Sequence, residues 1–525
     1  SVGPIFYLTA RGTTRTAAEN ALAILRDTEP ELHLRSVTLT AKDKICLCET
    51  RECTPEACPY ANGYYARIKG ALWDVLDVPC LTAETLQEYA ERHTVCPFEL
   101  GLDSSLWSDV IIGDYNYLFD PVVHLVRFFE SAGDYIFLVD EAHNLPGRAR
   151  EMHSAALTKT SFYEAKKLLG KGKSSLKNAL TKVNDVFIEW RHRAEEETAA
   201  RDGRFGKTFF LKERSEEFDH LLNRLCEPLE AWLDDHREPD ETHTALLQLY
   251  FDVRAWLRVA DTFDDHFVLQ ITASGSEVRA AQLCLDPSAF LADSFALGRA
   301  AVLFLATLAP ASYYKDLCGV PEARAVALRS PFPAGNQGLF CIGNVSTRYK
   351  DRDASLAIVE ESLATMVRAR CGNYLAFFPS YAYMEQAYAQ FKEHCPEINC
   401  IKQENAMDEQ QKAAFLAQFV PGPSQPLLGF AVMGGVFGEG VDLTGDRLIG
   451  VGIVGPGLPQ VGPRQEQLRD YFEQTRGSGF DYAYRYPGMN KVLQAAGRVI
   501  RTPRDKGVVL LIDNRFAMPD YRRLM

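Results

Sequence analysis

The sequence predicts an α/β protein built on two parallel sheets. Apolar runs of strand length occur in two sets, helical segments alternate with the second set, and apolar residues are numerous enough for several cores. The first set of runs lies at 5–10, 110–113, 136–139 and 302–306, and the second at 374–378, 427–432, 448–454 and 508–513. Such unbroken runs are typical of parallel strands covered on both faces. A helical segment at 383–394 follows the first run of the second set, as an α/β unit requires.

Length and composition set the broad class of the protein. With 525 residues, of which 46% are hydrophobic, the chain has room for three or four domains. The net charge of −13 argues against a protein that coats nucleic acid indiscriminately, but it is compatible with a local basic groove. No run of about 18 apolar residues occurs, so no membrane span is predicted. We expect a cytoplasmic monomer without a membrane partner.

The region between the two sets of strand-like runs has a different character. Residues 158–280 are charged and show little β pattern. Segments 215–225 and 242–257 carry apolar residues at spacings of three and four, which predicts amphipathic helices. A mainly helical domain is therefore expected here.

One strand-like run ends in acids. The apolar residues at 135–139 stop at Asp140 and Glu141, and ligands of parallel sheets bind outside the carboxyl ends of the strands. In phosphoryl transfer Asp140 could hold Mg²⁺ while Glu141 orients and deprotonates the attacking water. His143 could couple this site to its surroundings or cap a helix. The alternative for the whole segment is an N-cap, at Asp140 or Asn144.

A second group of candidate residues lies near the end of the chain. Arg498 and Arg501 are three residues apart, which on a helix places both guanidinium groups on one face, where they could clamp the γ-phosphate of ATP. The alternative is a basic helix with surface salt bridges. Glycines at 434, 435, 438 and 440 would let a loop approach a phosphate closely, or would form an ordinary turn between strand and helix.

The cysteines are concentrated near the start of the chain. Six of the thirteen lie between Cys46 and Cys96. In a reducing compartment, clustered thiols indicate a metal or an iron-sulfur cluster more often than disulfides. Spacing alone leaves zinc, iron and free thiols open.

These segments, taken in order, resemble the motifs of superfamily-two helicases of the XPD and DinG branch. Residues 140–143 resemble motif II, of the DEAH type, and residues 494–501 resemble motif VI. Further similarities are to motif Ia at 6–11, motif III at 304–310, motif IV at 374–380 and motif V at 438–442. The resemblance covers nearly the whole chain. It implies two RecA-like motor domains that use ATP and Mg²⁺.

The resemblance also assigns site residues. It implies cofactor contacts through Asp140, His143, Gln494, Gly438 and Asp442, and catalysis through Asp140, Glu141, Arg498 and Arg501. It places Arg11 and Thr307 on the nucleic acid. Tyr115 and Tyr117 are candidates for stacking on single-stranded DNA because they lie close in sequence to Cys96.

The domain organisation follows from the same resemblance. The first motor domain would be interrupted by a small [4Fe-4S] domain and by a helical Arch domain. The cluster ligands would be Cys46, Cys53, Cys58 and Cys96, with Cys48 as the alternative to Cys53. The expected segments are 1–41, 98–157 and 281–328 for the first motor domain, 42–97 for the cluster domain, 158–280 for the Arch and 329–525 for the second motor domain.

The expected function is that of an ATP-dependent DNA helicase. The resemblance implies 5′ to 3′ movement on single-stranded DNA and unwinding of forked or flapped duplexes, in DNA repair or in removing replication obstacles. Relatives carry a glycine-rich Walker A loop before motif Ia, whereas here Ser1 stands directly before that motif. We expect an upstream segment to supply this loop, and expect the chain as written to bind ATP poorly. The alternative is a DNA-binding scaffold that does not hydrolyse ATP.

Overall fold

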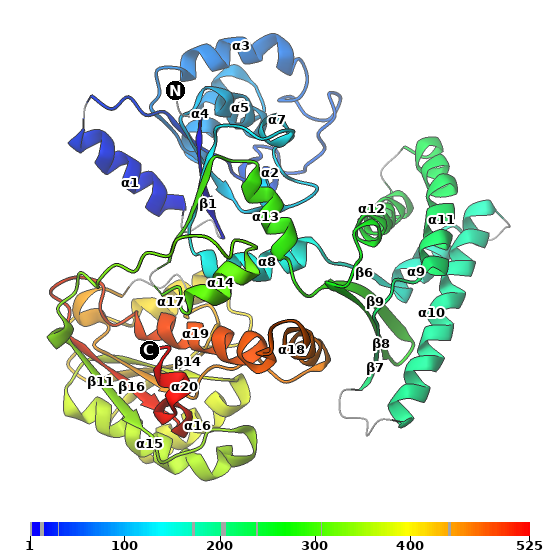
Figure 1. Ribbon diagram of the computed structural model, residues 1–525. Helices are drawn as coiled ribbons and strands as arrows, with labels where there is room; N and C mark the ends of the chain where they lie inside the picture. Colours follow the sequence, from blue (N-terminus) through cyan, green and yellow to red (C-terminus); the bar gives the residue numbers. More distant parts are fainter. Residues whose placement is uncertain are drawn as a thin grey trace. The chain divides into compact units, whose positions relative to one another are not determined.

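The structure, a computed structural model, divides into two compact units (Figure 1). Unit 1 comprises Ser1–Leu305 and Lys315–Pro321, and unit 2 comprises Ala306–Tyr314 and Glu322–Met525. The described residues are 3–10, 15–29, 31–170, 174–200, 206–237, 240–305, 307–438 and 443–525.

Unit 1 contains a six-stranded parallel sheet in the order β10-β5-β1-β4-β2-β3. Its central strand, β1, pairs with β4 on one side and β5 on the other, so that Phe6 lies opposite both Ile111 and Phe137. All three side chains are buried, which explains the apolar runs. The strands are β1 (Ile5–Thr9), β2 (Ser36–Thr38), β3 (Cys80–Leu81), β4 (Val110–Asp114), β5 (Ile136–Val139) and β10 (Ala300–Leu303).

Helices of varied length connect these strands. Helix α4 begins at a Thr82 cap, whose hydroxyl accepts a hydrogen bond from the backbone N–H of Thr85 at 3.3 Å. The helices are α1 (Arg15–Thr28), α2 (Lys42–Ile45), α3 (Tyr64–Val75), α4 (Ala83–His93), α5 (Pro97–Ser104), α6 (Asn116–Phe119), α7 (Val126–Phe129), α8 (Leu145–Met152) and α13 (Ser288–Ala296).

Between α8 and α13 the chain forms a helical region with a sheet of its own. The sheet is antiparallel, in the order β6-β9-β8-β7, and a tight turn at Gly275, with φ +60°, joins β8 to β9. The predicted helices are present, but the expectation of little β structure here is wrong. Because the strands pair with one another, they can bury alternate residues such as Leu269 and Ile271. The elements are β6 (Ala155–Thr158), α9 (Lys159–Leu168), α10 (Ser175–Ala200), β7 (Lys207–Leu211), α11 (Glu216–Asp235), α12 (Glu241–Asp261), β8 (Phe267–Ser274) and β9 (Glu277–Cys284).

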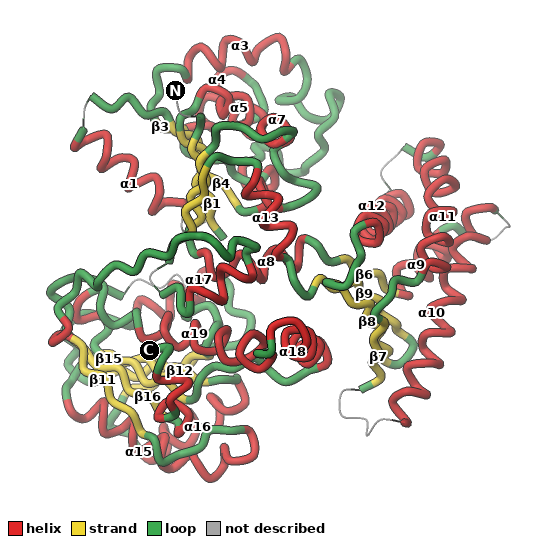
Figure 2. Tube along the Cα trace, in the orientation of Figure 1, coloured by secondary structure: helices red, strands yellow, loops and turns green. Residues whose placement is uncertain are grey.

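Unit 2 contains a second six-stranded parallel sheet, in the order β11-β16-β15-β12-β14-β13 (Figure 2). In its central strand β12, Leu375 and Phe377 belong to one core, whereas Tyr374, Ala376 and Phe378 belong to another, so both faces are covered. The strands are β11 (Gln337–Ile342), β12 (Asn373–Phe378), β13 (Asn399–Lys402), β14 (Leu427–Val432), β15 (Gly450–Val454) and β16 (Gly507–Ile512). The helices are α15 (Arg352–Ala369), α16 (Tyr381–His394), α17 (Glu409–Ala417), α18 (Pro463–Arg476), α19 (Tyr486–Ala496) and α20 (Pro519–Arg522), and α14 (Ala311–Leu317) runs from unit 2 into unit 1.

The two parallel sheets confirm the predicted α/β class. Strands β5 and β14 have the predicted bounds, whereas β10 begins and ends earlier than its apolar run suggested, at Ala300 and Leu303. Among the described residues, no helix is both long enough and apolar enough to cross a membrane.

Candidate nucleotide site and cysteine cluster

Three neighbouring strands of unit 1 end at the same edge of their sheet. In the parallel register, Leu8 of β1 lies beside Gly113 of β4 and Val139 of β5, so the residues that follow these positions meet. Backbone hydrogen bonds close the edge: Asp140 N donates to Leu8 O at 2.9 Å, and Tyr115 N donates to Thr9 O at 3.1 Å. This edge presents Asp140 and Glu141, where ligands of parallel sheets bind.

The carboxylate of Asp140 is held by two donors. The Tyr7 hydroxyl donates to Oδ2 at 3.0 Å, and the backbone N–H of Glu141 donates to Oδ1 at 2.7 Å. Burial, together with the nearby Asp140 charge, raises the pKa of Tyr7, so the phenol stays protonated and can donate this hydrogen bond. Each Oδ keeps a lone pair for a further partner.

Tyr115 fixes the backbone that carries the two acids. Its hydroxyl donates to the carbonyl oxygens of Asp140 and Glu141, the latter at 3.0 Å, and its ring is fully buried. Burial and the Asp140 charge raise the pKa of Tyr115. Tyr117 is buried as well, at 7% exposure. Neither ring therefore has a face accessible for the predicted stacking on DNA. Tyr115 instead supports the turn that carries the two acids.

Glu141 stands in an unusual backbone conformation. Its φ of 50° lies in the left-handed region, which costs an ordinary residue about 1 kcal/mol or more and is kept where the surroundings enforce it. Two hydrogen bonds hold the backbone in this conformation. The N–H of Ala142 donates to Phe304 O at 3.3 Å, and the Tyr115 hydroxyl donates to Glu141 O. The Glu141 side chain is 38% exposed and lies 3.3 Å from the Nδ1 atom of the nearly buried His143. A solvent-accessible carboxylate is thereby placed next to Asp140.

The N-cap alternative is not supported by the hydrogen bonds. Asn144 occupies the N-cap position of α8, yet its side chain makes no capping hydrogen bond. The Asp140 carboxylate bonds to Glu141 N within the turn, which leads into a short 3₁₀ segment at Ala142–Asn144.

In unit 2, the candidate phosphate-binding arginines do not lie on a helix. Helix α19 ends at Ala496 with Gly497 as its C-cap, so the predicted helical face shared by Arg498 and Arg501 is wrong. The chain turns instead because the Asp505 carboxylate accepts hydrogen bonds from the backbone N–H groups of Arg501 and Thr502, at 2.8 and 2.7 Å. Gln494 remains on the last turn of α19.

Arg498 contacts the glycine-rich loop after β14. Its guanidinium donates to Gly438 O at 3.0 Å. Within this loop Gly434 has φ +73°, and a Cβ there would lie 3.0 Å from the Lys491 side chain of α19. The glycine-rich loop therefore packs against α19 and the segment that follows it. Two predicted residues, Asp442 of this loop and Arg11 of unit 1, lie outside the described residues; Thr307 is described and half-buried.

The six early cysteines are free thiols, and four of them affect the pKa of one of two groups, Cys48 or Lys42. Cys48 and Cys58 lie 3.9 Å apart through their Sγ atoms, and burial together with Cys58 and Cys46 raises the pKa of Cys48 to about 11. Cys53, which is exposed, lies instead with Cys96 near Lys42, and both thiols contribute to raising the pKa of that lysine. Across the described parts of the chain, no three Cys, His, Asp or Glu side chains are placed to hold a metal ion. The donors fit a thiolate-ligated cluster in kind, and Cys48 interacts with two of the proposed ligands, Cys46 and Cys58.

Sequence reasoning missed the supporting role of two tyrosines. Tyr7 was read only as part of a strand, and Tyr115 as a DNA contact. A signal for Tyr7 was its place two residues before the end of β1, beside Leu138 of the strand that carries the acids. No local signal distinguishes Tyr115, because its partners lie 25 and 26 residues away.

Two protein families match the chain. Residues 363–525 match the helicase C-terminal domain, and residues 28–162 match the family described as DEAD_2. Among curated relatives, the general transcription and DNA repair factor IIH helicase subunit XPD of Schizosaccharomyces pombe is 24% identical, covering 84% of this chain and 67% of that protein. The ATP-dependent DNA helicase CHL1 of Coccidioides immitis is 22% identical, covering 82% of this chain and 58% of its own length.

Solved structures share the fold. A structure titled XPD_Helicase has a TM-score of 0.63 at 18% identity and covers 100% of this chain and 90% of that one. S. tokodaii Xpd4 has a TM-score of 0.56 at 14% identity, covering 98% and 92%. The chain spans less than two thirds of the length of several curated relatives, for example 44% of the rat regulator of telomere elongation helicase 1.

Proposed function

Because this chain belongs to the XPD-related branch of the superfamily-two helicases, we propose that it is the motor of an ATP-dependent DNA helicase that moves 5′ to 3′ on single-stranded DNA. Forked or flapped duplexes in DNA repair or at replication obstacles are the proposed substrates. The observation that carries the proposal is the pair of carboxylates, Asp140 and Glu141, held at the carboxyl edge of the unit 1 sheet.

The two acids are suited to different tasks in ATP hydrolysis. Asp140 is anchored by Tyr7 and by the backbone of Glu141, so it would be the fixed ligand for a Mg²⁺ ion. When bound, Mg²⁺ would neutralise charge on the phosphates. The Glu141 side chain is 38% exposed and lies beside His143, so it can orient a water molecule and accept its proton. His143, beside Glu141, positions that carboxylate.

Unit 2 would supply groups that recognise phosphate. Arg498 and Arg501 are the arginine pair, and Gln494 on α19 is a further nucleotide contact. The hydrogen bond from Arg498 to Gly438 O links the arginine to the glycine-rich loop. Asp442 remains a proposed nucleotide contact. Arg11 and Thr307 remain proposed contacts to DNA.

The cysteine-rich segment is proposed to hold a [4Fe-4S] cluster. Cys46, Cys58 and Cys96 would be ligands, with Cys53 or Cys48 as the fourth. A cluster there would cross-link residues 46–63, which form turns and bends rather than helices or strands, to Cys96, and so would stabilise them. Cys80, whose flanks Pro79 and Leu81 are apolar, is the matched non-ligand thiol.

Replacement of the proposed base tests the hydrolytic function. In the protein produced from the complete open reading frame, Glu141→Gln should reduce DNA-stimulated ATP hydrolysis about 100- to 10,000-fold, because proton acceptance is lost while shape is kept. Glu130→Gln, at an exposed position after α7, is the control and should hydrolyse ATP normally. Absence of DNA-stimulated hydrolysis in the unaltered complete protein would favour the DNA-binding scaffold instead.

Iron analysis tests the cluster without relying on activity. Protein purified without oxygen should contain about four iron atoms per chain and absorb visible light. Cys58→Ser should remove the iron, whereas Cys80→Ser should retain it. Comparing Cys48→Ser with Cys53→Ser identifies the fourth ligand. Bound zinc with no iron would contradict the cluster assignment.

A further inference from the structure

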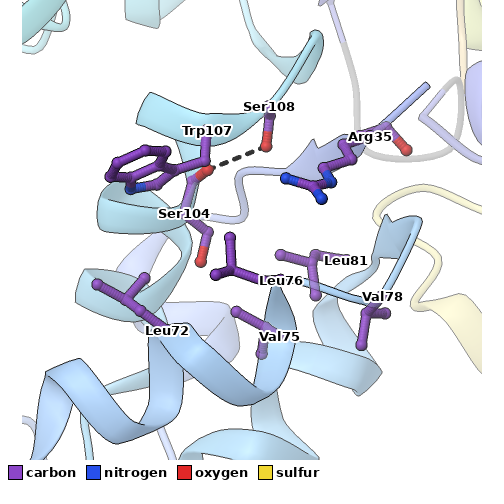
Figure 3. Close-up of a pocket in the computed structure, with 10 residues that line it drawn as sticks. Arg35, Leu72, Val75, Leu76, Val78, Leu81, Ser104, Trp107 and Ser108 are labelled. Atoms are coloured by element: carbon purple, nitrogen blue, oxygen red, sulfur yellow. Dashed lines mark hydrogen bonds between the residues drawn. The ribbon is translucent and has the colours of Figure 1, made fainter. Parts of the chain in front are cut away.

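A groove runs along one face of α3 in unit 1. Leu72, Leu76 and Trp107 line two adjoining hollows. One hollow, of about 190 Å³, is completed by Lys69 and Trp73, and the other extends to Arg35. Figure 3 shows the second hollow, with Trp107 at one end and Arg35 at the other. The groove is distinct from the edge that carries Asp140.

The tryptophans of this groove are unusually exposed. Trp73 is 75% exposed and Trp107 is 64% exposed, whereas the other three of the five tryptophans in the chain, Trp190, Trp232 and Trp256, are buried or half-buried. Tyr65, two helical turns before Trp73, is 88% exposed. Leaving large aromatic rings in water forgoes their burial energy, and such groups of exposed rings mark binding surfaces.

The charges that line the groove are all positive. Arg35 and Lys69 are its charged lining residues, and in the described chain neither side chain has an ion pair or hydrogen bond. Neighbouring acids have other partners: Asp74 lies 2.8 Å from His93 Nε2, and Asp109 accepts a hydrogen bond from the backbone N–H of Arg35 at 2.8 Å. The ligand that complements this surface is therefore both flat and anionic.

We propose that the groove binds single-stranded DNA, an inference that rests on the proposed helicase function. Bases stack on the indole rings of Trp73 and Trp107, and the phosphates lie beside Lys69 and Arg35. Every base has an aromatic face, so this combination of stacking and charge grips a strand without regard to sequence. A docked peptide helix would instead require a row of apolar anchors along a continuous trough. Here two small adjoining hollows lie beside exposed indole rings.

The position of the groove gives this contact a specific consequence. Helix α3 lies in the segment between Cys58 and Cys96, so a strand bound here is held by the cysteine-rich part of the chain. The grip does not involve the residues proposed to handle ATP. It therefore changes how tightly DNA is held rather than the chemistry of hydrolysis.

The test compares variants of the complete protein in binding to a labelled oligo-dT strand, followed by fluorescence anisotropy. Trp73→Ala combined with Trp107→Ala should weaken binding by more than about 5- to 100-fold, since that is the effect of losing one stacked base and this variant loses two. The same strand with abasic sites should bind both proteins equally weakly. Phe251→Ala removes a 56% exposed ring from α12, outside the groove, and is the matched control with unchanged binding.

A charge variant keeps the inference testable if the double variant does not fold. Lys69→Glu, at a position without a partner, should weaken oligo-dT binding and reduce its dependence on salt. Oligo-dT affinity that is unaltered by loss of both tryptophans, or by Lys69→Glu, would overturn the inference and assign the groove to a protein partner.

The outcome is separable from that of the proposed function. If single-stranded DNA stimulates ATP hydrolysis in the unaltered protein while the double variant still binds oligo-dT normally, the groove inference alone fails. If no DNA stimulates hydrolysis, the proposed function fails, whatever the groove binds.

Discussion

Unit 1 contains two groups of aromatic residues that differ in exposure. At the carboxylate edge, Tyr115 is fully buried and its hydroxyl is bonded to backbone carbonyls. In the groove along α3, Trp73 and Trp107 are mostly exposed and lie beside Lys69 and Arg35, whose side chains have no ion pair among the described residues. The buried ring determines where acidic groups stand, whereas the exposed rings are available to a ligand. The burial of an aromatic residue near a site must therefore be known before a role in ligand binding is given to it.

The largest expected effect is at the carboxylate edge itself. Asp140→Ala removes the acceptor of both Tyr7 and Glu141 N together with the proposed metal ligand, so DNA-stimulated ATP hydrolysis should fall about 100-fold or more. Asp134→Ala, which removes an exposed carboxylate paired with Arg299, is the control. If Asp140→Ala hydrolyses ATP as fast as Asp134→Ala does, the carboxylate edge is not the site of hydrolysis.

A buried ring outside both regions should affect stability only. His153 stacks on Phe290 at 3.9 Å between ring centroids, and burial lowers its pKa to about 4, although Asp120 acts in the opposite direction. The unfolded chain binds a proton at higher pH than the folded one, so the stabilising contribution is complete above about pH 6.5 and is lost as the pH falls towards 4.

His153→Phe keeps the stacking and removes this proton linkage. Between pH 7 and pH 5, the unaltered protein should lose about 1–2 kcal/mol more of its unfolding free energy than the variant does, as measured by urea denaturation. Equal losses in the two proteins would show that the pKa of His153 does not differ between the folded and unfolded states. Binding of oligo-dT should be the same in both.

The smallest effect is expected from the hydroxyl of Tyr115. Tyr115→Phe removes the hydrogen bonds to Asp140 O and Glu141 O and should lower the turnover number by up to about tenfold, with little change in DNA affinity. Tyr135→Phe is a matched control because its hydroxyl also donates to a backbone carbonyl, Phe128 O at 2.9 Å, away from the acids. It should lose comparable stability and keep its turnover number. Weakened DNA binding with an unchanged turnover number in Tyr115→Phe would contradict the supporting role of this hydroxyl at the acidic turn.

Local patterns predicted much of the fold. The apolar run before Asp140 became β5 within its predicted bounds, because a strand buried on both faces needs apolar residues at every position. The same reasoning failed where pairing was antiparallel. Strand β8 alternates apolar and polar residues only from Leu269 to Ser274, and β7 is a short run that does not alternate. The hairpin turn at Gly275 gave a further signal, which the sequence reasoning did not use.

Helical spacing was a weaker guide at the arginines. Arg498 and Arg501 were predicted to share a helix face, yet the helix ends at Ala496. The turn depends on the Asp505 side chain, which bonds to two backbone N–H groups and so offers the chain an alternative to helical hydrogen bonds. Gly497 gave a local signal for that ending.

The sequence by itself determined the parallel-sheet class and the acids that follow β5, because burial and strand order act through residues close together in the chain. Only the tertiary structure decided which side chains support those acids and which rings face water. The Tyr7 hydroxyl meets Asp140 across 133 residues, and Trp107 completes a groove on a helix that begins at Tyr64. Such contacts depend on strand register and helix packing, which no local spacing encodes.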